Sequence, residues 1–109
     1  MKYKYDASDD VLMFLRGKHI GTENAVTSAK IEQIFDVCGV EVRQIVNKLR
    51  CDGQPVCSNV NGYFYAKNRE EINDTIQQLL SRTKKISDAA QGLVLSHQVF
   101  YDGSDVLDG

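Results

Sequence analysis

Apolar side chains recur every three or four residues in four stretches of the chain, a spacing that predicts four helices. The first helix is expected over 9–16. Ser8 or Asp6 is placed to cap its N-terminus, and Gly17 is placed to end it in a left-handed conformation. Its apolar face consists of Val11, Leu12, Phe14 and Leu15. The polar stretch that follows predicts a loop.

The second helix is expected to begin after Thr27, a residue type that caps helix N-termini well. Val26 and Ile31 stand on either side of this start with the spacing of a hydrophobic staple. Ile34 and Phe35 continue the apolar stripe that Ile31 begins. We therefore expect all three stripe residues to face the core.

A tight turn is predicted at 36–39, with Val37 as the buried residue that sets the angle between two helices. The third helix is expected over 39–50. Glu41 stands three residues after Cys38, as in a capping box, although cysteine is a poor N-cap. The buried face of this helix consists of Val42, Ile45, Val46 and Leu49.

Two β-prone runs, 55–58 and 63–66, flank a sequence rich in Asn and Gly, and this arrangement predicts a hairpin. Tyr63 and Tyr65 would share one face of it and Phe64 the other. Because only one face of so small a hairpin is expected to be buried, either Phe64 or the two tyrosines should be largely exposed. A brief extended segment, Ala25-Val26, is expected to pair with the hairpin.

Asn68 is expected to cap the last helix, with Glu71 as the second member of a capping box. Gly92 is placed to end this helix near Gln91. Its apolar stripe repeats at heptad spacing. The stripe consists of Ile72, Ile76, Leu79, Thr83, Ile86, Ala90 and Leu93. The stripe either packs within the chain or zips against a second copy, and we favour a homodimer through this C-terminal helix.

This order of elements predicts a mainly α protein with a small β-wing: a winged helix-turn-helix with a long C-terminal helix. The winged domain is expected over 1–67 and the long helix over 68–95. An acidic, partly ordered tail is expected over 96–109.

The composition excludes several classes of protein. With 42% hydrophobic residues in 109, the chain has enough apolar material for one modest core. It has no run of about 20 apolar residues that would cross a membrane, and its N-terminus lacks the apolar stretch of a signal peptide. We therefore expect a cytoplasmic protein with no membrane contact. In that compartment Cys38, Cys51 and Cys57 are expected to be reduced packing residues.

A net charge of −2 argues against a nucleic-acid partner, but its distribution weakens that argument. Residues 96–109 carry three Asp and no Lys or Arg, whereas residues 25–95 carry nine basic and eight acidic side chains. The acidity therefore lies in the tail, and a local basic face remains compatible with DNA.

The exposed face of the third helix carries side chains that suit double-stranded DNA. Arg makes bidentate hydrogen bonds to guanine, and Gln or Asn to adenine, whereas basic residues near the helix end or after the wing suit phosphates. The predicted DNA-binding residues are Arg43, Gln44 and Asn47 for base edges, and Lys48, Arg50, Lys67 and Arg69 for phosphates.

Each of these residues also has a plainer interpretation. Any exposed face of an amphipathic helix is polar, and Arg69 is equally well explained as an ordinary first-turn residue. Glu41 repels phosphate, so it either serves the helix cap or accepts from cytosine N4. The hairpin tip is uncharged, so the wing is expected to make neutral contacts or none. The cluster Arg82, Lys84 and Lys85 is expected to be a solvated face.

The sequence contains few features that indicate catalytic activity. His19 lies in a loop and His97 in the tail, without a third ligand or an orienting acid at motif spacing. There is no phosphate-loop pattern and no Gly-x-Ser-x-Gly elbow. We therefore expect no enzyme activity, no cofactor, no metal and no small-molecule substrate. Cys38, at a helix N-terminus, is a candidate redox sensor, but a small buried turn residue is the favoured interpretation.

The run GVEVRQIVNKLRCDGQPVCS, followed by GYFYAKNREEI, resembles small winged-helix proteins of phages and prophages of Gram-positive bacteria. The resemblance spans about 26–93 and departs at Cys38, where the family has a capping serine. It implies a regulator of transcription or a replication-associated factor, non-enzymatic, that reads the DNA major groove with helix 39–50. The alternative is a winged-helix module for protein–protein interaction in a phage replication or packaging assembly.

Overall fold

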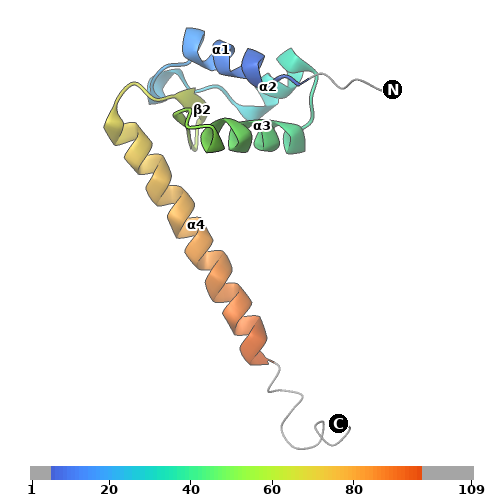
Figure 1. Ribbon diagram of the computed structural model, residues 1–109, viewed down its shortest axis with the longest axis vertical. Coiled ribbons are helices and arrows are strands. Elements are labelled where there is room, and N and C mark those ends of the chain that lie inside the picture. Colours follow the sequence, from blue (N-terminus) through green and yellow to red (C-terminus); the bar gives the residue numbers. More distant parts are fainter. Residues whose placement is uncertain (1–5, 97–109) are drawn as a thin grey trace, which may run out of the picture. The chain divides into compact units, whose positions relative to one another are not determined.

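The computed structural model describes residues 6–96, which are mainly helical and include one small antiparallel sheet (Figure 1). The elements are α1 (Ser8–Lys18), the 3-10 turn η1 (Thr22–Asn24), α2 (Ser28–Phe35), α3 (Gly39–Cys51), β1 (Val56–Asn59), β2 (Gly62–Tyr65) and α4 (Arg69–Leu95). This confirms the expected mainly helical chain with a small hairpin, and the order is compatible with a small winged-helix-like fold. All of the expected tail after residue 96, with His97, lies outside the described residues.

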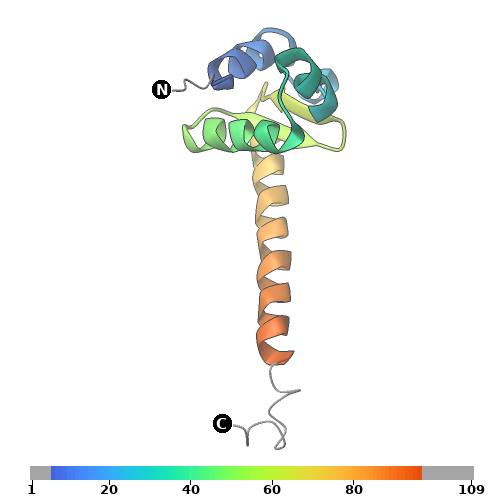
Figure 2. The same ribbon diagram turned by 90° about the vertical axis from the view of Figure 1, so that its right-hand side faces the viewer.

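The described chain forms two compact units, one ending at Thr75 and one beginning at Ile76. In the first unit α1, α2 and α3 gather around the hairpin (Figures 1 and 2). Their predicted apolar faces meet in one core, which consists of Ala7, Val11, Leu15, Val26, Ile31, Val42, Val46, Leu49 and Val56. The rings of Phe14 and Phe35 meet edge to face at its margin, with centroids 5.5 Å apart.

The second helix is capped as expected, but its stripe is narrower than predicted. The Oγ1 atom of Thr27 accepts a hydrogen bond from the Lys30 amide at 3.2 Å. Ile31 is fully buried and Phe35 is half-buried, whereas Ile34 is 47% exposed. At about 100° per residue, Ile31 and Phe35 lie only about 40° apart, while Ile34 lies about 100° from Phe35. The expectation that Ile34 faces the core was wrong.

The first helix passes through the glycine that was expected to end it. The amide of His19 still donates to the Leu15 carbonyl, at 2.9 Å, so α1 reaches Lys18 and Gly17 lies inside the helix. Gly17 is also absent from the glycines with positive φ. At the other end, the Asp6 carboxylate accepts from the Ser8 amide at 2.9 Å and from the Ser8 hydroxyl at 2.7 Å. Of the two candidate caps, Asp6 is therefore the residue whose side chain accepts from a backbone amide at this N-terminus.

The hairpin strand β2 forms hydrogen bonds along both of its edges. It pairs with β1 in the register that sets Val56 opposite Tyr65 and Cys57 opposite Phe64. On the other edge, Tyr63 exchanges two backbone hydrogen bonds with Val26, of 2.7 and 2.8 Å. This confirms the predicted pairing of the extended segment at Val26 with the hairpin.

Both faces of the hairpin are covered, contrary to the expectation that one would be exposed. Tyr63 and Tyr65 are half-buried against the core, while Phe64 is buried on the opposite face. The first two turns of α4 lie beside that opposite face: the Cys57 thiol donates to the Glu71 carbonyl at 3.6 Å. The compact unit therefore extends to Thr75, past the boundary expected at residue 67.

The start of α4 is fixed by Asn68 and Glu71. The Asn68 side chain accepts from the Glu71 amide at 2.9 Å, which confirms the predicted cap. The Glu71 carboxylate, however, reaches the amides of Lys67 and Thr22, each at 2.9 Å, instead of the Asn68 amide. Glu71 thus connects η1, the end of the hairpin and α4.

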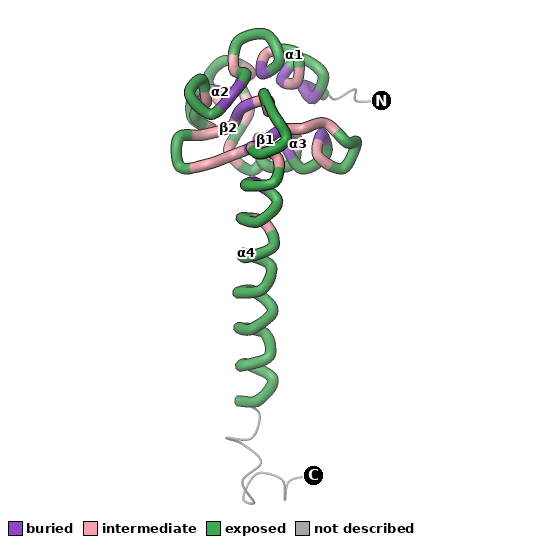
Figure 3. Tube along the Cα trace, turned by 90° about the vertical axis from the view of Figure 1, so that its left-hand side faces the viewer, coloured by how far each residue is buried: buried purple, intermediate pink, exposed green. Residues whose placement is uncertain are grey.

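The second unit is the remainder of α4, and Figure 3 shows it exposed along most of its length. The helix passes through Gly92 to Leu95, so the expected stop near Gln91 was wrong. A helical glycine with open space around it costs only about 1 kcal/mol relative to Ala, which is too little to end a helix. The stripe residues Ile86 and Leu93 are 63% and 71% exposed.

Replacing Gly17 with alanine should stabilise the protein by about 0.5–1 kcal/mol, because Gly17 is helical and a Cβ there meets no atom within 4 Å. Urea unfolding followed by circular dichroism would measure the change. A loss of stability would instead indicate a left-handed Gly17.

The contrasting variant is Gly62→Ala. Gly62 has φ 130°, and a Cβ there would lie 2.1 Å from the Val26 carbonyl oxygen. We expect this variant to lose at least about 2 kcal/mol, since the residue would be strained and the Val26 pairing displaced.

Candidate nucleic-acid interface

Helix α3 separates its buried and exposed residues along its whole length. Val42, Val46 and Leu49 enter the core, and Arg43, Gln44 and Asn47 are exposed on the other side. Among the described residues, none of these three exposed side chains has a hydrogen-bond or ion-pair partner. The polar atoms expected to meet base edges are therefore available to an external ligand.

The acidic residue on this helix has a structural role. Glu41 is half-buried, and its Oε1 atom accepts from the Cys38 amide at 3.0 Å. Of the two alternatives left open for Glu41, this geometry supports the cap. The carboxylate also interacts favourably with the N-terminal end of the helix dipole.

Lys48 is exposed on α3 but is paired with an acid from the start of α1. Its Nζ atom lies 2.8 Å from Asp6 Oδ2, and the two side chains are 53% and 59% exposed. The Lys48 ammonium and the Ser8 hydrogen bonds hold the pKa of Asp6 well below its usual range. The same hydrogen bond raises the pKa of Lys48, so both groups are charged at neutral pH.

Lys67 lies after β2, away from α3 in sequence, and is paired in the same way. Its Nζ atom lies 2.9 and 3.2 Å from the two carboxylate oxygens of Glu23, which belongs to η1. The hydrogen bond to Lys67 lowers the pKa of Glu23, and Glu23 in turn raises the pKa of Lys67.

Arg50 is half-buried and holds the hairpin to α3. Its Nε atom donates to the Val56 carbonyl at 2.8 Å, and its Nη2 atom donates to the Ser58 hydroxyl at 3.1 Å. The guanidinium therefore connects the last turn of α3 to β1. This placement makes Arg50 a positioning residue and takes at least these two donors away from phosphate.

Arg69, the last of the predicted residues, is exposed as the first residue of α4 and makes no side-chain hydrogen bond or ion pair among residues 6–96. The structure thus brings Arg43, Gln44, Asn47 and Lys48 together on one face of α3. Lys67 and Arg69 come from the segment after the hairpin.

Two exposed apolar residues were missed from the sequence. Val40 is 53% exposed on the first turn of α3, and Val60 is fully exposed at the hairpin tip. Val40 lies about 200° around the helix from Val42, so the helical period did place it opposite the buried stripe. The rest of the tip is held internally: the Asn59 side chain contacts Thr22 and accepts from the Asn61 amide.

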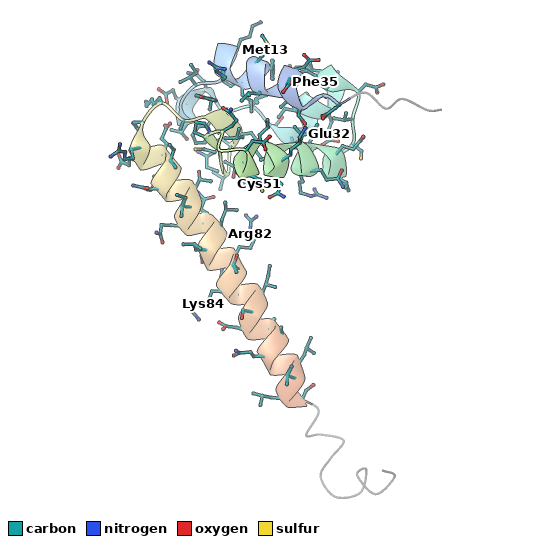
Figure 4. All side chains as sticks on the ribbon, viewed as in Figure 1. Met13, Glu32, Phe35, Cys51, Arg82 and Lys84 are labelled. Carbon is teal, nitrogen blue, oxygen red and sulfur yellow. The ribbon has the colours of Figure 1, made fainter. Side chains whose placement is uncertain are left out.

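The three cysteines are free thiols, but only Cys57 is buried. Burial raises the pKa of the Cys57 thiol. The expectation that all three are packing residues was wrong for Cys38 and Cys51, which are exposed; Figure 4 shows Cys51 on α3. At the start of α3 the Cys38 backbone amide donates to the Glu41 carboxylate, and this bond requires no buried Cys38 side chain.

Two further observations concern residues 6–96. No cluster of three or more His, Cys, Asp or Glu side chains there is arranged to hold a metal ion. Within the same range, no helix combines the length and the apolar character needed to cross a membrane.

Comparison of the chain with protein-family models, curated proteins and solved structures gives no match. The resemblance to phage winged-helix proteins therefore stays a prediction.

Arg50→Met, which keeps the apolar stem, should destabilise the protein by about 1–3 kcal/mol, because hydrogen bonds from a charged donor to the hairpin are lost. Arg43→Met is the matched control and should change stability by less than about 0.5 kcal/mol, since Arg43 is exposed and unpaired. Urea unfolding measures both. Equal effects would contradict the positioning role of Arg50.

Proposed function

We propose that this chain is a winged helix-turn-helix protein of phage or prophage type that binds double-stranded DNA through α3, as a regulator or replication factor. The observation that carries the proposal is the α3 face: Arg43, Gln44 and Asn47 are exposed, adjacent and without hydrogen-bond or ion-pair partners in the described part of the chain. A helix that packs on its own domain through one stripe and offers the other side to solvent fits the major groove.

The residue types on this face match the edges of different base pairs. Arg43 is suited to guanine O6 and N7, and Gln44 or Asn47 to adenine N6 and N7. Val40, exposed on the first turn, adds an apolar group suited to a thymine methyl. Together these side chains offer a mixed base-reading surface.

The phosphate contacts are assigned more narrowly than the sequence suggested. Lys48, Lys67 and Arg69 remain candidates, since all three are exposed. Arg50 supports the site indirectly by holding β1 against α3.

We also propose that the α4 stripe joins two copies of the chain. Beyond Thr75, the apolar residues Ile76, Ile86 and Leu93 remain 43% to 71% exposed. In proteins most of the stability of a helix comes from packing of its apolar face, so a partner for this stripe would stabilise α4. Arg82 and Lys84 leave different sides of α4 (Figure 4), and Lys84 pairs with Asp88 at 3.0 Å. A dimer would present two α3 helices to two half-sites.

The second candidate function is a winged-helix module for protein–protein interaction. It is favoured by Val60, fully exposed at the hairpin tip, and by the pairing of Lys48 and Lys67 with acids. An apolar, uncharged tip suits a protein surface better than a phosphate backbone.

The DNA-binding proposal is tested by selecting duplexes from a random pool with the wild-type chain and measuring affinity by fluorescence anisotropy. Arg43→Ala should weaken binding to a selected duplex by about 1–3 kcal/mol and relax preference at one base pair. Lys85→Ala, on the polar side of α4, is the control and should leave affinity unchanged.

Absence of duplex binding at low salt, or unchanged affinity of Arg43→Ala, would overturn the proposal. If the chain instead captures one defined protein partner and Val60→Asp, but not Arg43→Ala, abolishes that capture, the second candidate function is selected.

Self-association is tested with two variants, one that places a charge in the apolar stripe of α4 and one that places it on the opposite side of the helix. Ile86→Lys should dissociate the dimer because it buries an unpaired ammonium in the seam, whereas Ser81→Lys adds the same charge on the opposite side and should leave it intact. Sedimentation equilibrium measures both masses. A wild-type monomer at tens of micromolar would contradict the dimer.

A further inference from the structure

Both lysines among the predicted phosphate contacts are held by carboxylates from distant parts of the chain. Asp6 reaches Lys48 from a position 42 residues earlier, and Glu23 reaches Lys67 from 44 residues earlier. Neither pairing follows from a local helix repeat; the tertiary fold makes both. Within residues 6–96, Arg43 and Arg69 have no such acid.

We propose that Asp6 and Glu23 are internal competitors of the DNA phosphate, which hold the ammonium groups of Lys48 and Lys67 and so weaken sequence-independent binding. The inference rests on the proposed DNA-binding function and concerns how the same surface is regulated. A phosphate that takes either lysine must displace a carboxylate already in hydrogen-bonding contact.

The Asp6 carboxylate is positioned by the fold for this role. Its Oδ1 atom is occupied by the amide and hydroxyl of Ser8, and Oδ2 is the atom that meets Lys48. The pair lies beside an open hollow of about 330 Å³ that Glu41 and Gln44 also line. Both side chains remain more than half exposed, so a phosphate can reach the ammonium.

The Glu23 carboxylate is also positioned, by a close approach at Gly21. Gly21 is buried with φ 88°, and a Cβ there would lie 2.8 Å from Glu23 Oε1 and 3.0 Å from Lys67 Cδ. The absence of a side chain at Gly21 allows the acid and the lysine to meet over it. Both Glu23 oxygens face the Lys67 ammonium.

The consequence is weaker overall binding in which base contacts carry a larger share of the binding free energy. Phosphate contacts contribute equally to every DNA sequence, whereas base contacts distinguish them. The acids weaken the contribution of Lys48 and Lys67 and leave Arg43, Gln44 and Asn47 untouched. Affinity for every sequence therefore falls by the same factor, and base contacts supply a larger share of the binding free energy that remains.

Asp6→Asn tests the first pair, because Asn keeps an oxygen acceptor for Ser8 and removes the charge that holds Lys48. Binding is measured to a random-sequence duplex across a range of salt. The plot of log affinity against log salt should steepen by about 0.9, so that the loss of affinity between about 50 and 200 mM salt grows roughly 3.5-fold. Glu23→Gln should add a similar increment.

Two variants separate pairing from overall charge. Asp10→Asn makes the same charge change at an exposed acid of α1 that pairs with no lysine among the described residues, and it should leave the slope unchanged. In a Lys48→Met background, Asp6→Asn should no longer steepen the slope. Equal slopes for Asp6→Asn and Asp10→Asn, or a full effect without Lys48, would overturn the inference.

A heparin column distinguishes failure of this inference from failure of the proposed function. If wild type and variants do not bind duplex DNA but Asp6→Asn elutes from heparin at higher salt than Asp10→Asn, the internal competition stands and the DNA-binding proposal falls. If Arg43→Ala loses duplex binding while Asp6→Asn and Asp10→Asn behave alike on both probes, the proposed function stands and the internal competition falls.

Discussion

The fold of the first unit depends on strand β2, which forms backbone hydrogen bonds along both edges. One edge meets β1 and the other meets Val26, with Gly62 close enough to the Val26 carbonyl that no side chain fits between them. An isolated two-stranded hairpin is marginally stable in water, so these additional contacts matter. They connect the segment before α2 to the segment after α3, and the two helices between these points are held at both ends.

The position of α3 follows from this arrangement. Its apolar stripe is fixed by the core, and Arg50 fixes its last turn against Val56. The Glu71 carboxylate accepts from the Thr22 amide, and the first two turns of α4 lie beside the hairpin face that carries Cys57. The orientation of the exposed face of α3 is therefore fixed by contacts that do not involve the residues of that face. Side chains on a helix fixed in this way can meet a ligand without reorganisation of the backbone.

Features set by local chemistry were predictable, and features set by distant contacts were not. The Thr27 and Asn68 caps, the Gly-containing turn and the buried stripe of α3 depend on residues within a few positions of one another. The hairpin face that carries Phe64 lies beside α4, which starts later in the chain. The alternation of residues within the hairpin cannot predict this contact. The role of Arg50 was missed for the same reason. Sequence spacing shows that a basic residue lies at a helix end, but the tertiary fold determines that its guanidinium donates to the Val56 carbonyl. Gly17 and Gly92 show a different error, since a glycine in open space weakens a helix without ending it.

The charge of the candidate site is likewise a tertiary property. The chain carries a net charge of −2, and this composition argues against a DNA partner. Yet the acids are not spread evenly over the surface: two of them sit on Lys48 and Lys67, and Glu41 caps α3 through the Cys38 amide. Each of these three acids is thereby committed to a partner, and the α3 face retains Arg43 with two neutral amides. Under the proposed DNA-binding function, base edges would contribute more to binding than bulk electrostatic attraction, because carboxylates of the chain already hold Lys48 and Lys67.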